Sequence, residues 1–328
     1  MTGESQLEKN RRIFFPYMHR VVAEMTRKAL EHSKSPRFAY YTTSETAFNI
    51  IKNKEIWMRN VTTMNDYMEV KHGLTCLQSA YAQKALNDRF TALIDSCHPG
   101  LTAETENMFS AWLTAIQNDT YITCLSEHLD GEDKHGRLSM WRAYGGRSGV
   151  ALILNSDVIL GESDILGATS SPVAYKDEAG VAFEFGVVVD NIENSIEYVR
   201  SMDRENLKNM IFSMFLFSVL GTKHPGFHEE KEWRVVSSPK IYGAGFTTQD
   251  VEVVRGIPQI VSKIKLDNNY PDELAGIAIP NLLDRIIIGP TEFPEVMRKA
   301  FVSLLLEANV ADAADKVFVS HLPLRNLD

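Results

Sequence analysis

The segment HPGFHEEKEWRVV, residues 224–236, gathers charged side chains at the start of a predicted strand. Successive side chains of a strand point to opposite faces. The pattern therefore predicts that Glu230, Glu232 and Arg234 share one face and that Trp233 packs into the core from the other. On this prediction, the two carboxylates lie roughly 6–7 Å apart along the strand.

Two interpretations of this acidic face stay open. On a solvated edge strand, the charges would discourage aggregation and Arg234 would offset the glutamates. Alternatively, Glu230 and Glu232 form a catalytic pair for cleavage of a glycosidic bond, which passes through an oxocarbenium-like transition state. One carboxylate would hold a ribose hydroxyl and stabilise the developing positive charge, and the other would orient or deprotonate the nucleophile. The second interpretation requires a bound nucleotide sugar.

Other parts of the chain offer groups that suit such a ligand. Tyr40 and Thr42 share one face of a predicted strand, residues 38–43. Trp141 and Tyr144 lie three residues apart, on one side of a helical turn. The glycines after Tyr144 would let the backbone approach a ligand closely. Both pairs are also typical of ordinary core packing, because buried aromatic residues with polar tips commonly find partners.

A metal site or a nucleophile is the other chemical alternative. His224 and His228 are four residues apart, as are Cys124 and His128. A Pro-Gly pair between the two histidines interrupts any helix that would align them, so we expect no metal. Ser126 and Cys124 lack a recognisable partner pattern for nucleophilic catalysis.

Composition narrows the class of protein. The chain has 328 residues, of which 44% are hydrophobic and 23% charged, as in globular domains. Its net charge of −9 argues against a broad nucleic-acid surface, although a local basic groove stays possible. Three widely spaced cysteines fit a reducing cytosol. The N-terminus lacks the apolar core of a signal peptide. The longest apolar stretch, residues 210–221, is too short to cross a membrane. We expect a cytoplasmic protein.

Strands and helices are interspersed along the chain, which favours an α+β fold over a doubly wound sheet. Helical spacing covers residues 6–33, about 67–96, about 102–117, about 190–221 and 291–310, the last with Thr291 as a cap. Strands are predicted at 38–43, 55–61, 120–126, 149–155, 171–177, 285–290 and 316–323. Thr43 or Ser44 would cap a helix after the first strand.

Four segments, in order, resemble a bacterial family catalogued as domain of unknown function 2971. They are FAYYTTSETAFNIIKNKEIWMRNVTTMNDYME, YITCLSE, MWRAYGGRSGVALIL, and GFHEEKEWRVV with the later RIIIGP. The resemblance spans about 37–290. Ala39 and Leu125 stand where the family has a tyrosine and a phenylalanine, and these departures leave the polar positions in place.

The layout of these motifs is also remotely similar to ADP-ribosyltransferases, which finish with Glu-x-Glu on a late strand. This similarity implies a split antiparallel or mixed β-sheet core with helical insertions. It implies that Glu232 is the catalytic glutamate on the ribose hydroxyl and that Glu230 orients the acceptor. The residues expected to bind NAD are Tyr40, Thr42, Asn65, Ser126, Trp141, Tyr144 and Arg234.

The domain organisation follows from the same resemblance. Residues 1–36 would form an N-terminal helical segment, and residues 37–328 a single ADP-ribosyltransferase-like domain with helical insertions near 67–117 and 190–221. The protein would bind NAD as a substrate and transfer ADP-ribose to a macromolecule, protein or nucleic acid, without a metal or a membrane. Such an activity would suit a toxin or phage-defence effector with an antitoxin or regulatory partner.

Two alternatives remain beside this hypothesis. The first is a non-catalytic module of the same fold that binds a nucleotide or a protein, with Glu230 and Glu232 in structural roles. The second is a metal-dependent hydrolase that uses His224 and His228 with Cys124 or His128.

Overall fold

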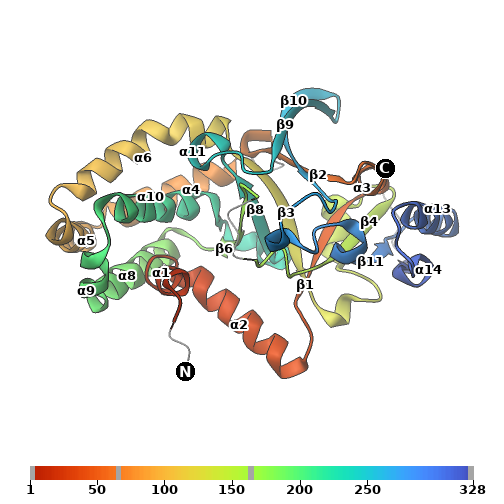
Figure 1. Cartoon of the computed structure of the whole chain (residues 1–328), viewed down its shortest axis with the longest axis horizontal. Coiled ribbons are helices and arrows are strands. Elements are labelled where there is room, and N and C mark those ends of the chain that lie inside the picture. Colours follow the sequence, from red (N-terminus) through yellow and green to blue (C-terminus); the bar gives the residue numbers. More distant parts are fainter. Residues whose placement is uncertain (1–3, 64–67, 162–165, 324–328) are drawn as a thin grey trace. The chain divides into compact units, whose positions relative to one another are not determined.

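The computed structural model describes residues 4–63, 68–161 and 166–323 (Figure 1). The chain divides into two compact units, each built from segments that are far apart in sequence. Unit 1 contains residues 1–28, 61–120 and 171–228, and unit 2 contains residues 29–60, 121–170 and 229–328. Both predicted helical insertions fall in unit 1.

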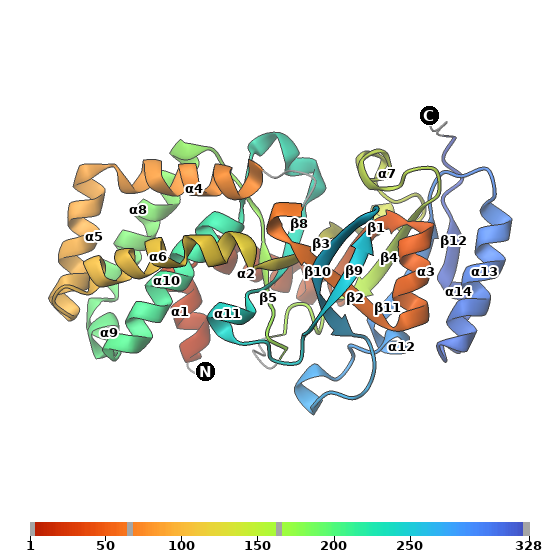
Figure 2. The same ribbon diagram turned by 90° about the horizontal axis from the view of Figure 1, so that it is seen from above.

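Unit 1 is mostly helical (Figure 2). Its elements are α1 (Gln6–Phe14), α2 (Pro16–His32), η1 (Val61–Thr63), α4 (Met68–Tyr81), α5 (Lys84–Cys97), α6 (Leu101–Asn118), β6 (Ala174–Tyr175), α8 (Glu178–Asn194), α9 (Ile196–Ser201), α10 (Arg204–Leu220), β7 (Thr222–Lys223) and η3 (Pro225–Glu230). Two of them reach beyond the unit, because α2 and η3 both end in unit 2.

The core of unit 1 is an aromatic cluster between the long helices. The ring of Phe90 lies 5.2 Å from Phe185, and the ring of Tyr81 lies 5.6 Å from Phe215, between ring centroids. The predicted buried helix at 210–221 is confirmed, because this stretch forms most of α10. In the parts of the chain that the structure describes, no helix combines the length and the apolarity needed to span a membrane.

Several predicted helices are interrupted in the structure. The helical stretch 6–33 breaks before Pro16, since the residue that precedes a proline is disfavoured in a helical conformation. The stretch 67–96 is the two helices α4 and α5. Thr43 caps the helix after the first strand, as predicted, but Thr291 does not cap α13, which begins at Pro294.

Unit 2 carries a mixed, open sheet. Its elements are β1 (Arg37–Thr43), α3 (Ser44–Asn53), β2 (Glu55–Asn60), β3 (Tyr121–His128), η2 (Asp130–Glu132), α7 (Leu138–Tyr144), β4 (Gly149–Asn155), β5 (Thr169–Pro172), which ends in unit 1, β8 (Glu232–Ser237), α11 (Pro239–Tyr242), β9 (Thr248–Val254), β10 (Ile257–Lys265), η4 (Asp272–Leu274), α12 (Ile279–Leu282), β11 (Leu283–Ile288), α13 (Pro294–Glu307), α14 (Ala313–Lys316) and β12 (Val317–Val319). The protein is therefore of the α+β class.

The sheet branches at β3. The strand order is β12-β11-β4-β1-β3-β2-β10-β9, and β8 also pairs with β3. Ser126 lies opposite both Ala39 of β1 and Glu232 of β8, so β1 and β8 flank opposite edges of β3. Further along β3, Ile122 lies opposite both Arg59 of β2 and Val236 of β8. Strands β1 and β2 thus share one edge of β3, and the sheet divides between them.

The two faces of β1 are distinct. Residues directly opposite each other in antiparallel strands point to the same face. Ala39 and Tyr41 lie in a buried cluster on one face, which we call the Tyr41 face, together with residues of α7, β4 and β11: Met140, Trp141, Ala151, Ile153 and Ile287. The other face carries Phe38, whose ring packs against Trp233 at 5.2 Å.

The hairpin of β9 and β10 was not predicted from the sequence (Figure 2). Arg255 and Gly256 connect the two strands, and both have positive φ angles, 51° and 80°. A two-residue turn with positive φ at both positions matches the twist of a hairpin and is commonly Asn-Gly. Because Arg255 occupies the first turn position, the sequence does not show the usual signature of this turn.

Candidate functional site

A polar network centred on Arg137 lies on the Tyr41 face of unit 2. The guanidinium donates to the Ser126 hydroxyl at 2.6 Å and to the Glu127 carbonyl oxygen at 2.7 Å. It also forms two hydrogen bonds with the Glu132 carboxylate, at 2.8 and 3.0 Å. The backbone N–H of Arg137 donates to the Tyr41 hydroxyl at 2.8 Å. This fork of charge-assisted bonds fixes the loop before α7 on β1 and β3.

The same guanidinium holds the turn that precedes β8. It donates to the carbonyl oxygens of Glu229 and Glu230, at 2.9 and 3.1 Å. Ser126 donates its hydroxyl hydrogen to the Glu230 carbonyl at 2.5 Å while accepting from Arg137. Between this turn and β8, Lys231 has a φ of 44°, which is the left-handed region that non-glycine residues rarely adopt.

This turn separates the two candidate glutamates. The prediction that Glu230 belongs to the strand is wrong, because Glu230 ends the 3-10 helix η3 and β8 begins at Glu232. The left-handed conformation of Lys231 interrupts the alternation that the prediction assumed. Glu230 instead accepts a hydrogen bond from the Tyr144 hydroxyl, 3.2 Å from its Oε1 atom. The structure therefore brings Glu230 together with Tyr144 of α7.

Glu232 and Arg234 form a buried ion pair on β8. Nε of Arg234 lies 2.7 Å from Oε1 of Glu232, and the two side chains are 3% and 5% exposed. Glu232 lies opposite Ser126 and Arg234 opposite Cys124, so all four belong to the Tyr41 face. Such burial excludes the solvated edge strand and makes the pair costly unless it is well compensated.

The structure places Tyr40 and Thr42 away from these groups. Both alternate with Tyr41 on β1, so they point to the opposite face. Burial raises the pKa of Tyr40, against the effect of its hydrogen bond with Thr123. Asn65, the other residue expected to bind NAD, lies outside the described residues.

Trp141 lies on the Tyr41 face but is enclosed in the core. Its side chain is 2% exposed, and its indole N–H donates to the His135 carbonyl at 2.8 Å. Three glycines make room for the ring, since a Cβ atom would lie 2.6 Å from it at Gly136, 2.7 Å at Gly289 and 3.0 Å at Gly149. Gly149, expected to approach a ligand, thus approaches Trp141. Burial also raises the pKa of the neighbouring Tyr41 to about 12.

A second charged cluster surrounds Arg37 at the end of β1. The Arg37 guanidinium, 6% exposed, contacts three carboxylates, those of Asp130, Asp133 and Asp284, at 2.6, 2.8 and 2.9 Å. Burial alone would raise the pKa of Asp133, but the hydrogen bond from Arg37 lowers it overall. Nε2 of His128 lies 2.9 Å from Asp133, and burial lowers the pKa of this histidine. We interpret this cluster as structural.

The candidate metal ligands do not gather in the structure. Within residues 4–63, 68–161 and 166–323, no group of three or more His, Cys, Asp or Glu side chains is arranged to hold a metal ion. His228 interacts through Nδ1 with the Pro225 carbonyl at 3.1 Å, and His224 accepts a hydrogen bond from the Gly226 N–H at 3.1 Å. These histidines shape the turn of η3.

Besides Glu132 and Tyr41, the Tyr41 face therefore combines two carboxylates, a hydroxyl, a second phenol and two guanidinium groups. Carboxylates can stabilise positive charge and accept a proton, and hydroxyl or guanidinium donors can bind phosphate or ribose oxygens. The residues that supply these groups are Ser126, Arg137, Tyr144, Glu230, Glu232 and Arg234.

Arg137 was not singled out from the sequence. It lies in the polar loop EHLDGEDKHGR, where an arginine next to four acids is typical of a solvated loop. In the sequence, only the five-residue spacing between Glu132 and Arg137 relates these two residues. Without the fold, this spacing does not predict that they interact. Its partners on β3 and before β8 become visible only when these strands are paired.

Comparison with known proteins gives one result for this chain. Neither the curated proteins nor the solved structures contain a match. Residues 140–235, which include Trp141, Tyr144, Glu230, Glu232 and Arg234, match the model of a family described as "Protein of unknown function (DUF2971)". The match covers 96 of the 328 residues and supports the resemblance of this region to that family.

Proposed function

We propose that this protein is an ADP-ribosyltransferase that binds NAD on the Tyr41 face of unit 2. In this reaction the bond between C1′ of the ribose and the nicotinamide nitrogen breaks, and nicotinamide leaves with the electron pair. A nucleophile of a macromolecule then bonds to C1′ and loses its proton. Glu232 stabilises the positive charge that develops on the ribose, and Glu230 orients the nucleophile and accepts its proton.

The observation that carries the proposal is the convergence of Ser126 with both glutamates. Ser126 lies opposite Glu232 across the β3–β8 ladder, and its hydroxyl donates to the backbone of Glu230. One polar position thus touches the strand and the turn that supply the two carboxylates. Tyr144 adds a hydroxyl beside the Glu230 carboxylate.

Some expected contacts are left out of the proposal. Tyr40 and Thr42 point to the other face of β1, and Trp141 is enclosed by core residues. We therefore assign Ser126 and Tyr144 to the NAD site and Arg234 to the support of Glu232. The acceptor stays defined only by its chemistry, as a macromolecule with a nucleophilic side chain or base.

One observation favours a second candidate function. The Glu232 carboxylate is engaged by Arg234 and lies almost entirely out of solvent. A carboxylate held in this way is typical of a structural ion pair as well as of an oriented catalytic group. The second candidate is therefore a non-catalytic module that binds ADP-ribose or a related nucleotide on the same face.

The test is transfer of label from NAD, labelled in its adenylate part, to bacterial cell extract. Wild-type protein is compared with Glu230→Gln and Glu232→Gln, each of which removes charge but keeps the size of the side chain. Glu229→Gln is the matched control, because its side chain is exposed and Arg137 uses only its backbone carbonyl. Melting temperatures of all variants are measured to exclude unfolding.

We expect label transfer by the wild type and the Glu229 variant, and a loss of at least about 100-fold in the Glu232 variant, as for other electrostatic catalytic groups. Equal transfer by wild type and Glu232→Gln would end the catalytic assignment. Stabilisation by ADP-ribose without any turnover of NAD would establish the second candidate; a ligand at 100 times its Kd adds about 2.7 kcal/mol.

A further inference from the structure

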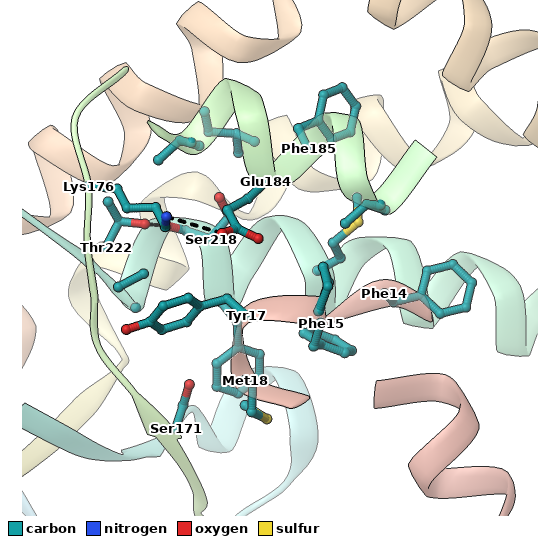
Figure 3. A pocket seen from close by; sticks show the side chains of 18 of the residues that line it. Phe14, Phe15, Tyr17, Met18, Ser171, Lys176, Glu184, Phe185, Ser218 and Thr222 are labelled. Carbon is teal, nitrogen blue, oxygen red and sulfur yellow. Dashed lines mark hydrogen bonds and ion pairs between the residues drawn. The ribbon is translucent and has the colours of Figure 1, made fainter. Parts of the chain in front are cut away.

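Unit 1 contains a pocket that the proposed function does not use (Figure 3). Its cavity volume is about 120 Å³, and all of its lining residues belong to unit 1. An apolar cavity of about 150 Å³ is large enough to bind benzene. The pocket is slightly smaller than that cavity, so about one ring or a short alkyl chain fills it.

The walls of the pocket are mainly aromatic and aliphatic. The break between α1 and α2 at Pro16 brings Phe15 and Tyr17 to the wall, and Phe185 of α8 lines the cavity as well (Figure 3). Phe15 is held by the ring of Phe217, 6.2 Å away between centroids. The Tyr17 hydroxyl donates to the Val173 carbonyl at 3.0 Å, which fixes its ring in place.

A charged group lies at one end of these walls. Nζ of Lys176 is 3.1 Å from the Glu184 carboxylate, as the dashed line in Figure 3 marks. Arg20 also binds Glu184, with one nitrogen 2.6 and 2.7 Å from its two oxygens. The Glu184 charge is thus shared by two cations, and the group as a whole carries one excess positive charge.

Lys176 keeps the capacity to bind a ligand. Its ammonium has three N–H donors, and Glu184 takes one of them. The side chain is 24% exposed, so it is partly shielded from water and still reachable. A carboxylate of a ligand would receive charge-assisted hydrogen bonds here, whereas an ammonium group would face two cations that already surround Glu184.

We propose that this pocket binds a small amphipathic carboxylate, with its apolar body among the aromatic walls and its carboxylate on Lys176. The site is independent of the proposed chemistry in unit 2. It would make unit 1 a receptor for a hydrophobic acid, either an aryl-alkanoate or a short aliphatic acid.

The test uses three probes that share one apolar body: 3-phenylpropanoate, 3-phenylpropanamide and 3-phenylpropylamine. Their binding to the full chain is measured by isothermal titration calorimetry at pH 7 and low salt. We expect the carboxylate to bind about tenfold more tightly than the amide, and the amine most weakly. Equal affinities of the three probes, or no binding by any of them, would overturn the proposal.

Two variants localise the site. Lys176→Met keeps the length of the side chain and is expected to weaken carboxylate binding about tenfold while leaving amide binding unchanged. Ser218→Leu narrows the cavity and is expected to weaken both. Lys84→Met, which removes an exposed ion-paired lysine of the same unit, is the matched control. An unchanged carboxylate affinity in Lys176→Met contradicts the assignment. If a variant fails to fold, the probe series on the wild-type protein still tests the proposal.

Discussion

The guanidinium of Arg137 lies 2.6 Å from the hydroxyl of Ser126, so a loop arginine is hydrogen-bonded to strand β3. The same guanidinium reaches the turn before β8. Through this relationship, the position of Glu230 depends on a residue almost a hundred positions earlier in the chain. The network explains how a turn with exposed acids is held against the sheet.

Arg137→Met is expected to lower the free energy of unfolding by about 3 kcal/mol, because several carbonyl oxygens and the Glu132 carboxylate lose their donor. Arg137→Lys should recover less than half of this loss, since an ammonium cannot form the bidentate pair. Urea denaturation measures both effects. Arg142→Met, which alters an exposed arginine of α7, is the control; a loss of equal size there would refute the special role of Arg137.

The buried pair of Glu232 and Arg234 predicts strong coupling. Each single variant, Glu232→Gln or Arg234→Met, is expected to lower the free energy of unfolding by about 3–5 kcal/mol, because it removes the opposite charge that compensates a buried charge. The double variant should cost less than the sum, with a coupling of about 1–3 kcal/mol. Additive losses in a double-mutant cycle would show that the two side chains act independently.

Lys231 predicts a backbone effect in the turn between the two glutamates. Lys231→Val should lower the free energy of unfolding by about 2 kcal/mol, because a β-branched residue strongly disfavours the left-handed conformation. Lys231→Gly should be close to neutral, since relief of strain is offset by the larger chain entropy of glycine, about 0.5–1 kcal/mol. Both variants lack the lysine side chain, so a difference between their urea midpoints does not arise from its loss. Equal midpoints would contradict the prediction.

Protonation of His128 is expected to lower the free energy of unfolding in mild acid. Burial lowers its pKa in the folded protein below the ordinary value near 6.5, so the unfolded chain binds the proton more readily. The contribution of His128 is therefore complete above about pH 6.5 and declines as the pH falls through the folded pKa. The variant His128→Gln should show a flatter dependence of the melting temperature between pH 7 and pH 5. His32→Gln, at an exposed position, should keep the wild-type slope.

The carboxylates around Arg37 add a second acid transition. Hydrogen bonds from Arg37 keep the pKa of Asp133 and of Asp284 below their usual values despite burial. The contribution of the two carboxylates is complete above their ordinary pKa near 3.8 and declines as the pH falls through their lower folded pKa, because they stay ionised until the solution is more acidic. Because His128 contacts Asp133, the two losses are coupled, and one pH series measures them together.

Local patterns in the sequence predicted most of the individual elements. Residue types predicted β1, β3 and β4, and the Thr43 cap of α3 follows from its type and position. Breaks inside long helical stretches were harder, because Pro16 is compatible with the first turn of a new helix. The β9–β10 turn was not predicted, because arginine rarely occupies a position with positive φ.

The site was less predictable because it depends on contacts between distant strands. The strand register, in which Ser126 lies opposite both Ala39 and Glu232, decides which face of β1 is shared with Glu232. No local sequence pattern predicts this register. The sequence therefore favoured Tyr40, whereas Tyr41 shares the face. The left-handed Lys231 is likewise invisible in a run of residues that otherwise alternates as a strand.

The branch at β3 has a consequence for the order in which the chain can fold. Strand β3 needs β1 and β2 on one edge and β8 on the other, and these partners span residues 37–237. On the ribosome, β3 would emerge with one edge available for pairing while more than a hundred further residues are still to be made. Completion of the sheet is thus a late event in synthesis, and a chain that stops before Ser237 would expose the edge of β3 to other strands.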